Sequence, residues 1–533
     1  MRHRVVSSSL NWRDVGLREG RTSGMEQSTD DGVYGEEPHH APPPDAVEPI
    51  SREPDPPVVA TDDRAAEAVP ALPAAVDRAA TGEALGDELP AEALPPLDVP
   101  AEPILPAVAT RTARRGFRPA TAVMLAMLLL SFFLRVLWLD QPPGSMIFDE
   151  KYYVSAARTI LDLPQPADAP YAHSTPGKDA NQEHPPLAKL IMAYDMRLLG
   201  DNGWGWRWGS VVAGTLAIAF MYQVGRHLGL GPWTGLLAAF LFSYDNLVFV
   251  TSRIGILDIF MVLGMVAGAA WFLQRRPILA GLAFAFGTLC KEYGLYGPAI
   301  MLLYTVALTL YQRPAWKLVR QRALRTVVMG VVYLASFLVA LWLLDLRWST
   351  YTNPITHLLS IWSYGTKLTH SHGPTGIESW PWEWLINEVQ IPYLRVTVTI
   401  CGVSLGDGVP CPQDNVIRQF DSILFRGALN PYLIAGLPLA LAYALARLRG
   451  SDNRNALLAL VWFALAYLPF LPATVLDHRI AYIYYMLPAV PAIALASAEL
   501  FADPRIPRSV TIGYIVAILY GFAGYFPFAG FKL

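Results

Sequence analysis

The stretch PATAVMLAMLLLSFFLRVLWL, residues 119–139, is the first part of this chain that is long and apolar enough to cross a bilayer. Four basic residues stand directly before it: Arg111, Arg114, Arg115 and Arg118. Basic flanks of a membrane span stay in the cytoplasm, so this stretch predicts an uncleaved signal anchor with its N-terminal side inside. The extreme N-terminus lacks the apolar core of a secretory signal.

Ten further apolar stretches follow this one. The approximate spans are 119–139, 208–226, 233–250, 256–273, 277–291, 295–311, 326–345, 430–446, 456–475, 480–498 and 510–528. The connections that fall inside carry most of the basic residues, including a cluster from Arg313 to Arg325, whereas the short outside connections carry little more than Arg253, Lys291 and Arg479. This asymmetry predicts an all-α polytopic membrane protein of about 11 transmembrane helices, with two long extracytoplasmic loops at 140–207 and 346–429.

The composition supports a membrane protein with a polar tail. Of the 533 residues, 53% are hydrophobic and only 16% are charged. Residues 1–115 differ from the rest: they are rich in Pro, Ala and acidic residues, and we expect a disordered cytoplasmic tail. The predicted divisions of the remainder are a catalytic membrane module at 116–345, the second loop at 346–429 and a four-helix module at 430–533. No basic patch interleaved with aromatics occurs, which argues against nucleic acid as a partner.

Two adjacent carboxylates follow the first span, in Ile147-Phe148-Asp149-Glu150-Lys151-Tyr152-Tyr153. An acid at a helix start commonly caps the helix, and capping accounts for one of the two. It does not account for the second acid and the tyrosines beside it. A positioned carboxylate can also remove the proton of an attacking hydroxyl, so this motif indicates chemistry at the outer membrane surface.

Several isolated ionisable groups fall on the same outer side. They are His184 and Lys189 around a Pro-Pro helix start, Arg207 among tryptophans, Arg253 with Asp258, Lys291 with Glu292, and Asp477-His478-Arg479. Ionisable residues near membrane depth are candidates for functional sites, although snorkelling at helix ends is the alternative for any one of them. A planar, permanently charged Arg207 also suits a phosphate.

The second loop contains Ser379-Trp380-Pro381-Trp382-Glu383-Trp384 and two of the three cysteines. The tryptophans fit either an interfacial belt or a surface against a lipid or sugar. Cys401 and Cys411 flank a Gly-rich turn and are candidates for a disulfide in an oxidising compartment, whereas Cys290 is expected to pack in a helix. No Cys/His spacing indicates a metal site, so no cofactor is predicted, and a divalent metal requirement stays open.

Two absent motifs narrow the energy source of any transfer reaction. The sequence has neither a Walker-type phosphate loop nor an Asp-x-Asp pair, the usual arrangement for a metal-bound nucleotide sugar. A transferase that faces outside therefore needs an activated donor that is already in the membrane. A sugar on a lipid phosphate meets that need, because the phosphate leaves and cations stabilise its charge.

The chain resembles the protein O-mannosyltransferase family, integral-membrane glycosyltransferases of the GT-C fold that use dolichyl- or polyprenyl-phosphate mannose. The matching pieces are Phe148 to Tyr153, His184-Pro185-Pro186-Leu187-Ala188-Lys189, Gly205-Trp206-Arg207, Arg253 to Asp258, Ser379 to Trp384, and Arg479 to Pro488. They follow the family's order and span roughly residues 120 to 500. The chain departs from the family at Ala188, at His370 to Pro374 and at Lys291 to Gly294, and it lacks the soluble insert of eukaryotic members.

The resemblance implies roles for individual residues. Asp149 is the expected catalytic base, and Glu150 is expected to orient the acceptor or Asp149. The residues expected to bind donor phosphate or substrate are Arg135, Tyr153, His184, Lys189, Arg207, Arg253, Asp258, Lys291, Trp382, Arg479 and Tyr484. The implied reaction is a single inverting displacement at the anomeric carbon.

The implied partners are membrane lipid, a polyprenyl-phosphate-linked sugar donor and a polypeptide acceptor, with the secretion translocon as a candidate meeting place. The implied location is the plasma membrane. Two other interpretations stay open: a GT-C transferase acting on a lipid or cell-wall glycan, and a transporter or flippase without bond chemistry. A transporter predicts charges at mid-membrane on broken helices, whereas here the charges gather at the outer ends.

Overall fold

The computed structural model describes residues 119–401, 411–450 and 453–529, which belong to one compact unit of residues 115–533. The acidic tail predicted at 1–115 lies outside the described residues. The helices are α1 (Pro119–Val136), α2 (Glu150–Leu161), α3 (Leu187–Leu199), α4 (Gly203–His227), α5 (Gly231–Ser243), α6 (Asn246–Thr251), α7 (Asp258–Leu273), α8 (Pro277–Cys290), α9 (Tyr296–Gln312), α10 (Trp316–Trp348), α11 (Pro354–Lys367), α12 (Pro381–Trp384), α13 (Pro431–Arg447), α14 (Arg454–Tyr467), α15 (Phe470–Val475), α16 (Val490–Phe501) and α17 (Arg508–Gly524). The described residues also form the 3₁₀ segments η2 (Glu292–Leu295), η3 (Gln413–Asn415) and η4 (Ile483–Ala489).

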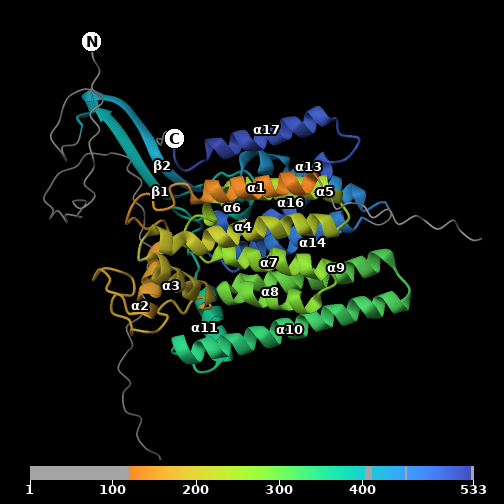
Figure 1. The fold of residues 1–533 in the computed structure, drawn as a ribbon, viewed down its shortest axis with the longest axis horizontal. Helices are drawn as coiled ribbons and strands as arrows, with labels where there is room; N and C mark the ends of the chain where they lie inside the picture. Colours follow the sequence, from red (N-terminus) through yellow and green to blue (C-terminus); the bar gives the residue numbers. More distant parts are fainter. Residues whose placement is uncertain (1–118, 402–410, 451–452, 530–533) are drawn as a thin grey trace, which may run out of the picture. The chain divides into compact units, whose positions relative to one another are not determined.

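The apolar helices lie side by side in one bundle (Figure 1). Six segments among the described residues are long and apolar enough to cross a membrane, and five shorter apolar helices coincide with the other predicted spans. The mostly helical membrane fold is confirmed, while the count of eleven crossings stays a prediction. The long α10 exposes leucine and valine side chains along most of its length, as a lipid-facing helix does, whereas α16 is buried at the centre of the bundle.

Small residues let the central helices approach closely. A Cβ atom added to Gly264 of α7 would lie 2.5 Å from the Cα of Gly287 in α8, and one added to Gly225 of α4 would lie 2.8 Å from the Cα of Gly235 in α5. The hydrophobic effect does not drive helices together inside a bilayer, because lipid tails are as apolar as the helix surfaces. Close van der Waals packing at these glycines therefore stabilises the contacts between the helices.

Two predicted spans are interrupted in the structure. The span 233–250 is divided at Tyr244, because the side chain of Asp245 accepts a hydrogen bond from the Val248 N–H and so starts the separate helix α6. The span 480–498 begins with the 3₁₀ segment η4, which contains Pro488, before α16 starts. Proline lacks the N–H that a continuing α-helix needs.

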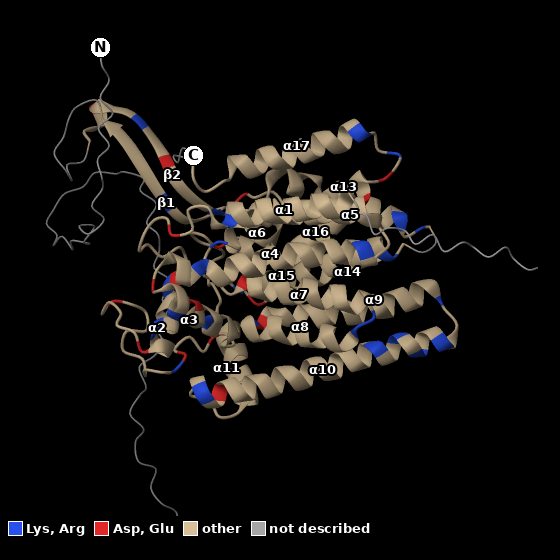
Figure 2. Cartoon of the chain, viewed as in Figure 1, with Lys and Arg blue, Asp and Glu red and all other residues tan. Residues whose placement is uncertain are grey.

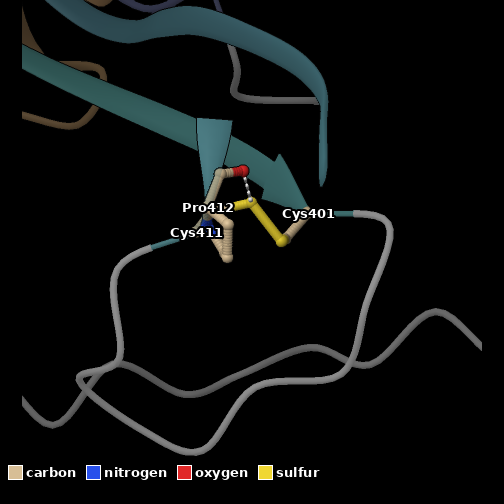
Figure 3. Close-up of a disulfide and its surroundings, with 3 residues drawn as sticks. All are labelled: Cys401, Cys411 and Pro412. Atoms are coloured by element: carbon tan, nitrogen blue, oxygen red, sulfur yellow. Dashed lines mark hydrogen bonds between the residues drawn. A yellow bond between two sulfur atoms is a disulfide. The ribbon is translucent and has the colours of Figure 1, made fainter. Parts of the chain in front are cut away.

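The second long connection contains a β-hairpin that the all-α prediction lacked. Strands β1 (Ile391–Cys401) and β2 (Val416–Gly427) pair antiparallel, with Ile391 opposite Gly427 and Cys401 opposite Val416. Cys401 and Cys411 are joined by a disulfide at the far end of β1, with their Cα atoms 5.7 Å apart (Figure 3). The free Cys290 is buried in α8, where a packing role was expected.

The connections at the two ends of the bundle differ in character. One end has short turns in which Lys and Arg gather, for example between α9 and α10 and between α16 and α17 (Figure 2). The other end contains α2, α3, α11 and the hairpin, together with most of the acidic residues seen in this view (Figure 2). The candidate site lies at this second end.

Candidate active site

Asp149 stands at the N-terminus of α2 but does not cap it. It has helical backbone angles, φ −71° and ψ −3°, and its side chain makes no capping hydrogen bond to the helix. The residue before it, Phe148, has a left-handed φ of 56° and stacks on Tyr393 of β1, with ring centroids 4.3 Å apart. A positive φ is costly for a bulky side chain and is found mainly where function requires it. Asp149 itself is half-buried.

The neighbouring Glu150 is wholly buried and fully bonded. Its Oε1 accepts hydrogen bonds from Arg207 Nε at 2.8 Å and from the Gly255 N–H at 2.7 Å. Its Oε2 accepts from Arg207 Nη2 at 2.8 Å and from the Ile147 N–H at 2.7 Å. We call this bidentate pair the Glu150–Arg207 clamp. It joins the start of α2, the first turns of α4 and the loop before α7.

All three nitrogens of the Arg207 guanidinium donate hydrogen bonds to protein oxygens. Besides the two bonds to Glu150, Nη1 donates to the carbonyls of Leu139 and Gln141, at 2.8 and 3.5 Å, and Nη2 donates to Ser145 O at 2.8 Å. These carbonyls lie in the segment that leads from α1 to Asp149. The geometry therefore differs from the phosphate-binding role expected for Arg207 and the acceptor-orienting role expected for Glu150. Both side chains fix the backbone that carries Asp149.

A second ion pair faces Asp149 from the bundle. Lys291 Nζ donates to both carboxylate oxygens of Asp258, at 2.9 and 3.0 Å, and lies 5.6 Å from the ring centroid of Tyr484. The charge of Asp149 acts on Lys291, Tyr393 and Tyr484. The structure thus brings together Asp258, Lys291 and Tyr484, three of the residues predicted from the sequence, around Asp149.

His184 and Tyr153 border the same space. His184 Nδ1 lies 2.8 Å from Glu292 Oε2, and its ring centroid lies 6.2 Å from that of Tyr153. Burial raises the pKa of the Tyr153 hydroxyl well above its ordinary value, and the charge of Asp149 adds to this. The Tyr153 hydroxyl therefore stays protonated and can act as a hydrogen-bond donor.

Arg479 reaches this region through tyrosine. Its Nη2 donates to Tyr293 Oη at 2.9 Å, and its Nη1 donates to the carbonyl of Gly365 in α11. Tyr293 directly follows Glu292, so Arg479 contacts the residue next to the His184–Glu292 pair.

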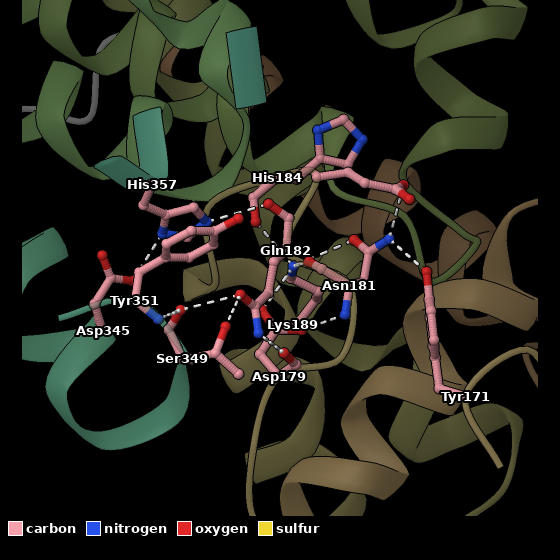
Figure 4. Close-up of polar contacts among 12 residues, drawn as sticks. Tyr171, Asp179, Asn181, Gln182, His184, Lys189, Asp345, Ser349, Tyr351 and His357 are labelled. Atoms are coloured by element: carbon pink, nitrogen blue, oxygen red, sulfur yellow. Dashed lines mark hydrogen bonds and ion pairs between the residues drawn. The ribbon is translucent and has the colours of Figure 1, made fainter. Parts of the chain in front are cut away.

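Lys189 is buried in the first long loop and does not reach Asp149. Its Nζ lies 2.7 Å from Asp179 Oδ2 and donates to the carbonyls of Asn181 and His184 (Figure 4). This differs from the substrate-binding role expected for Lys189: its ammonium holds the turn that presents His184. Burial raises the pKa of the Asp179 carboxyl, while the ammonium of Lys189 acts against that effect.

The same loop is attached to the end of α10 by residues that the sequence did not single out. His357 of α11 lies between Asp345 Oδ1, 2.8 Å from its Nδ1, and Gln182 O, 3.2 Å from its Nε2 (Figure 4). Asp345 and His357 are both buried. Their partners are far away in the sequence, so no local pattern identifies them. Tyr393 was missed for the same reason, because its significance comes from its contact with Phe148.

Arg135 and Arg253 lie in the interior, where they bond to uncharged oxygens. Arg135 donates to Ser252 Oγ at 2.7 Å and to the hydroxyl of Ser131. Arg253 donates to the carbonyls of Leu134 and Leu137 at the end of α1. These contacts hold α1 against the segment before α7, and the donor-binding role expected for both residues stays a prediction.

Trp382 lies apart from this group. It is 47% exposed and stacks on Trp380, with ring centroids 4.9 Å apart. Its neighbour Trp384 is buried and donates from its indole N–H to Ser379 Oγ at 2.9 Å. Within the described ranges, no group of three or more His, Cys, Asp or Glu side chains has the arrangement of a metal site, and a metal requirement remains open.

A family model described as dolichyl-phosphate-mannose-protein mannosyltransferase matches residues 183–342. A polyprenol-phosphate-mannose–protein mannosyltransferase of Corynebacterium glutamicum is 25% identical over 71% of this chain and 82% of its own length. One of Mycolicibacterium smegmatis is 31% identical over 29% of each chain, so this match spans less than a third of that relative.

Among solved structures, the S. cerevisiae protein O-mannosyltransferase Pmt1-Pmt2 complex bound to the sugar donor matches with a TM-score of 0.58. The match covers 76% of this chain and 90% of that chain at 12% identity, a level that shows the fold. The architecture is thus the GT-C fold. The family model over residues 183–342 and the curated relatives show that the chain is similar to the protein O-mannosyltransferase family.

Proposed function

We propose that this protein transfers mannose from a polyprenyl-phosphate-mannose donor to Ser or Thr hydroxyls of polypeptides. The observation that carries the proposal is the contrast between two adjacent acids. Glu150 is buried and saturated by four hydrogen bonds, whereas Asp149 is half-buried and its charge acts on Lys291 and on three tyrosines. The names of the relatives, polyprenol-phosphate-mannose–protein mannosyltransferases, support the same donor and acceptor.

In the proposed reaction, the acceptor oxygen attacks the anomeric carbon of mannose while Asp149 takes the hydroxyl proton. The bond from that carbon to the phosphate oxygen breaks, and its electron pair leaves with the polyprenyl phosphate. No covalent sugar–enzyme intermediate forms. Lys291 is the cation beside Asp149, and we assign it to the phosphate side, where a positive charge stabilises the leaving group. The Glu150–Arg207 clamp keeps the base in place.

The orientation in the membrane follows from the charges. The end of the bundle where Lys and Arg gather is the cytoplasmic end under the positive-inside rule, and α2, which begins directly after Asp149, lies at the opposite end (Figure 2). We therefore propose a plasma-membrane protein with an extracytoplasmic site. There it meets polypeptides leaving the secretion translocon.

The test is a transfer assay with membranes that contain the full chain and radiolabelled polyprenyl-phosphate mannose. We expect label in polypeptide, released by mild alkali as an O-linked sugar is, and absent from membranes without the chain. Label that appears only in solvent-extractable lipid or glycan would move the proposal to the other acceptor class of the GT-C fold. No transfer from this donor, by a folded chain, would refute the donor assignment.

A further inference from the structure

A polar cavity lies at the end of the bundle away from Asp149. It has a volume of about 400 Å³ and is enclosed by the α4–α5 connection, α13, α14 and the end of α16. Helix α4 runs from Gly203, which bonds to Asp140 near the candidate site, to His227 beside this cavity, so the two sites are at opposite ends (Figure 1). We call it the Arg447–Glu499 cavity. Its volume is typical of ligand sites, which have about 300–1,000 Å³.

Three polar atoms in its wall are buried and have no hydrogen-bond partner. They are Arg447 Nε, Asn455 Oδ1 and Glu499 Oε2. Glu499 is only 7% exposed, and its other oxygen lies 3.5 Å from Arg447 Nε, beyond good hydrogen-bond geometry. A buried carboxylate oxygen without a protein donor is costly, so these atoms indicate a ligand-binding site.

The charges of the wall are balanced. Arg447 and Arg505 oppose Glu499 and Asp503. Asp503 is already bonded, since it accepts from Tyr443 Oη and from the Arg505 N–H at 2.8 Å. What remains open is one carboxylate oxygen and one amide oxygen, which need donors, beside one guanidinium N–H, which needs an acceptor. A ligand with both a protonated amine and a phosphate meets all three, whereas a simple anion or cation does not.

The surroundings favour a lipid as the source of that group. The cavity lies among helix ends, where phospholipid headgroups are expected under the orientation proposed above. The flanking helices expose apolar side chains on which acyl chains can lie, among them Leu439 and Leu445 of α13 and Val510 and Ile512 of α17. We propose that the Arg447–Glu499 cavity binds the headgroup of an ethanolamine phospholipid. The ammonium donates to Glu499 Oε2 and Asn455 Oδ1, and the phosphate accepts from Arg447.

This assignment predicts selectivity between phospholipids. The trimethylammonium of a choline lipid has no N–H to donate, and a glycerol lipid has no ammonium, so both leave Glu499 unpartnered. Removing one hydrogen bond to a charged group changes affinity by about tenfold or more. The full chain should therefore retain phosphatidylethanolamine about tenfold better than phosphatidylcholine or phosphatidylglycerol.

Native mass spectrometry of the purified full chain, incubated with equal amounts of the three lipids, measures this selectivity. Glu499→Gln should abolish the preference, and Asn455→Ala, at a half-buried position, provides the same test if the first variant fails to fold. Glu388→Gln, at an exposed position at the opposite end of the bundle, is the matched control and should keep the preference.

Three outcomes overturn the proposal. Equal retention of the three lipids by the unaltered chain shows that the cavity does not recognise the ammonium group. A preference that survives both cavity variants places the lipid elsewhere. Equal thermal stabilisation by water-soluble glycerophosphoethanolamine shows that the ligand is a free metabolite and not a lipid.

Discussion

Replacing Glu150 by Gln tests whether the clamp holds the catalytic segment. Each carboxylate oxygen of Glu150 accepts from two donors: Oε1 from Arg207 and Gly255, and Oε2 from Arg207 and Ile147. A glutamine must direct its amide NH₂ at one of these donor pairs, in either orientation of the amide. Two hydrogen bonds are then replaced by contacts between donors, and the buried Arg207 loses its counterion.

The cost can be estimated from the burial. Removing one partner of a buried ion pair costs about 3–5 kcal/mol, because the other charge is left uncompensated. The segment that carries Asp149 also loses its anchor, and a shift of about 1 Å at a catalytic group lowers turnover by about a hundredfold. Glu150→Gln should therefore lose both stability and activity.

Equilibrium unfolding in detergent micelles measures the first effect and the rate of mannose transfer the second. The double variant of Glu150→Gln with Arg207→Gln should cost clearly less than the sum of the single variants, with a coupling of about 1 kcal/mol or more. A stability loss in Glu150→Gln below about 1 kcal/mol, or transfer at the normal rate, would refute the positioning role of the clamp.

Three more predictions concern the segments at the Asp149 end of the bundle. Burial raises the pKa of Asp195 in α3 from 3.8 to about 6, so the stability that its protonated form contributes is lost as pH rises through 6. The free energy of unfolding of Asp195→Asn should exceed that of the unaltered chain by about 1–3 kcal/mol at pH 7 and equal it near pH 4. Equal pH profiles of thermal unfolding for the two proteins would contradict this prediction. Lys189→Met leaves the buried Asp179 without its counterion and should lower the unfolding free energy by about 3–5 kcal/mol, and adding Asp179→Leu should restore part of this loss. An equal loss in the double variant would exclude the buried ion pair as the cause. Cys401→Ser removes a disulfide that spans a sequence separation of 10 and should destabilise the hairpin by about 2–3 kcal/mol. Amide hydrogen exchange in β1 and β2 should become faster, and unchanged exchange would mean that strand pairing alone holds the hairpin.

Hydropathy predicted the bundle well because every span must be apolar and long enough to cross the bilayer. The apolar helices of the structure coincide with the predicted stretches, and the errors occur where local chemistry interrupts a run, as at Asp245 and Pro488. The hairpin could have been predicted, since Val396-Thr397-Val398-Thr399-Ile400 has the β-branched pattern of a strand. The prediction treated this segment as loop between helices.

The candidate site was predicted in part. Sequence placed Asp149, Lys291, Asp258 and Tyr484 on one side of the membrane, and the structure brings them together. It could not show that Glu150 is saturated, because its partner Arg207 is 57 residues away and the contact exists only in the fold. Basic residues such as Arg207 look alike in sequence whether they bind a phosphate or a neighbouring carboxylate.

The central claim is that the half-buried carboxylate of Asp149 removes the acceptor proton. The most direct measurement is the turnover of purified Asp149→Asn at saturating donor and acceptor, beside its thermal unfolding. General-base catalysis contributes about 10²–10⁴-fold, so we predict a loss of at least a hundredfold with an unfolding temperature close to that of the unaltered chain. Turnover within a few fold of the unaltered chain, in a variant that is equally stable, would contradict the account.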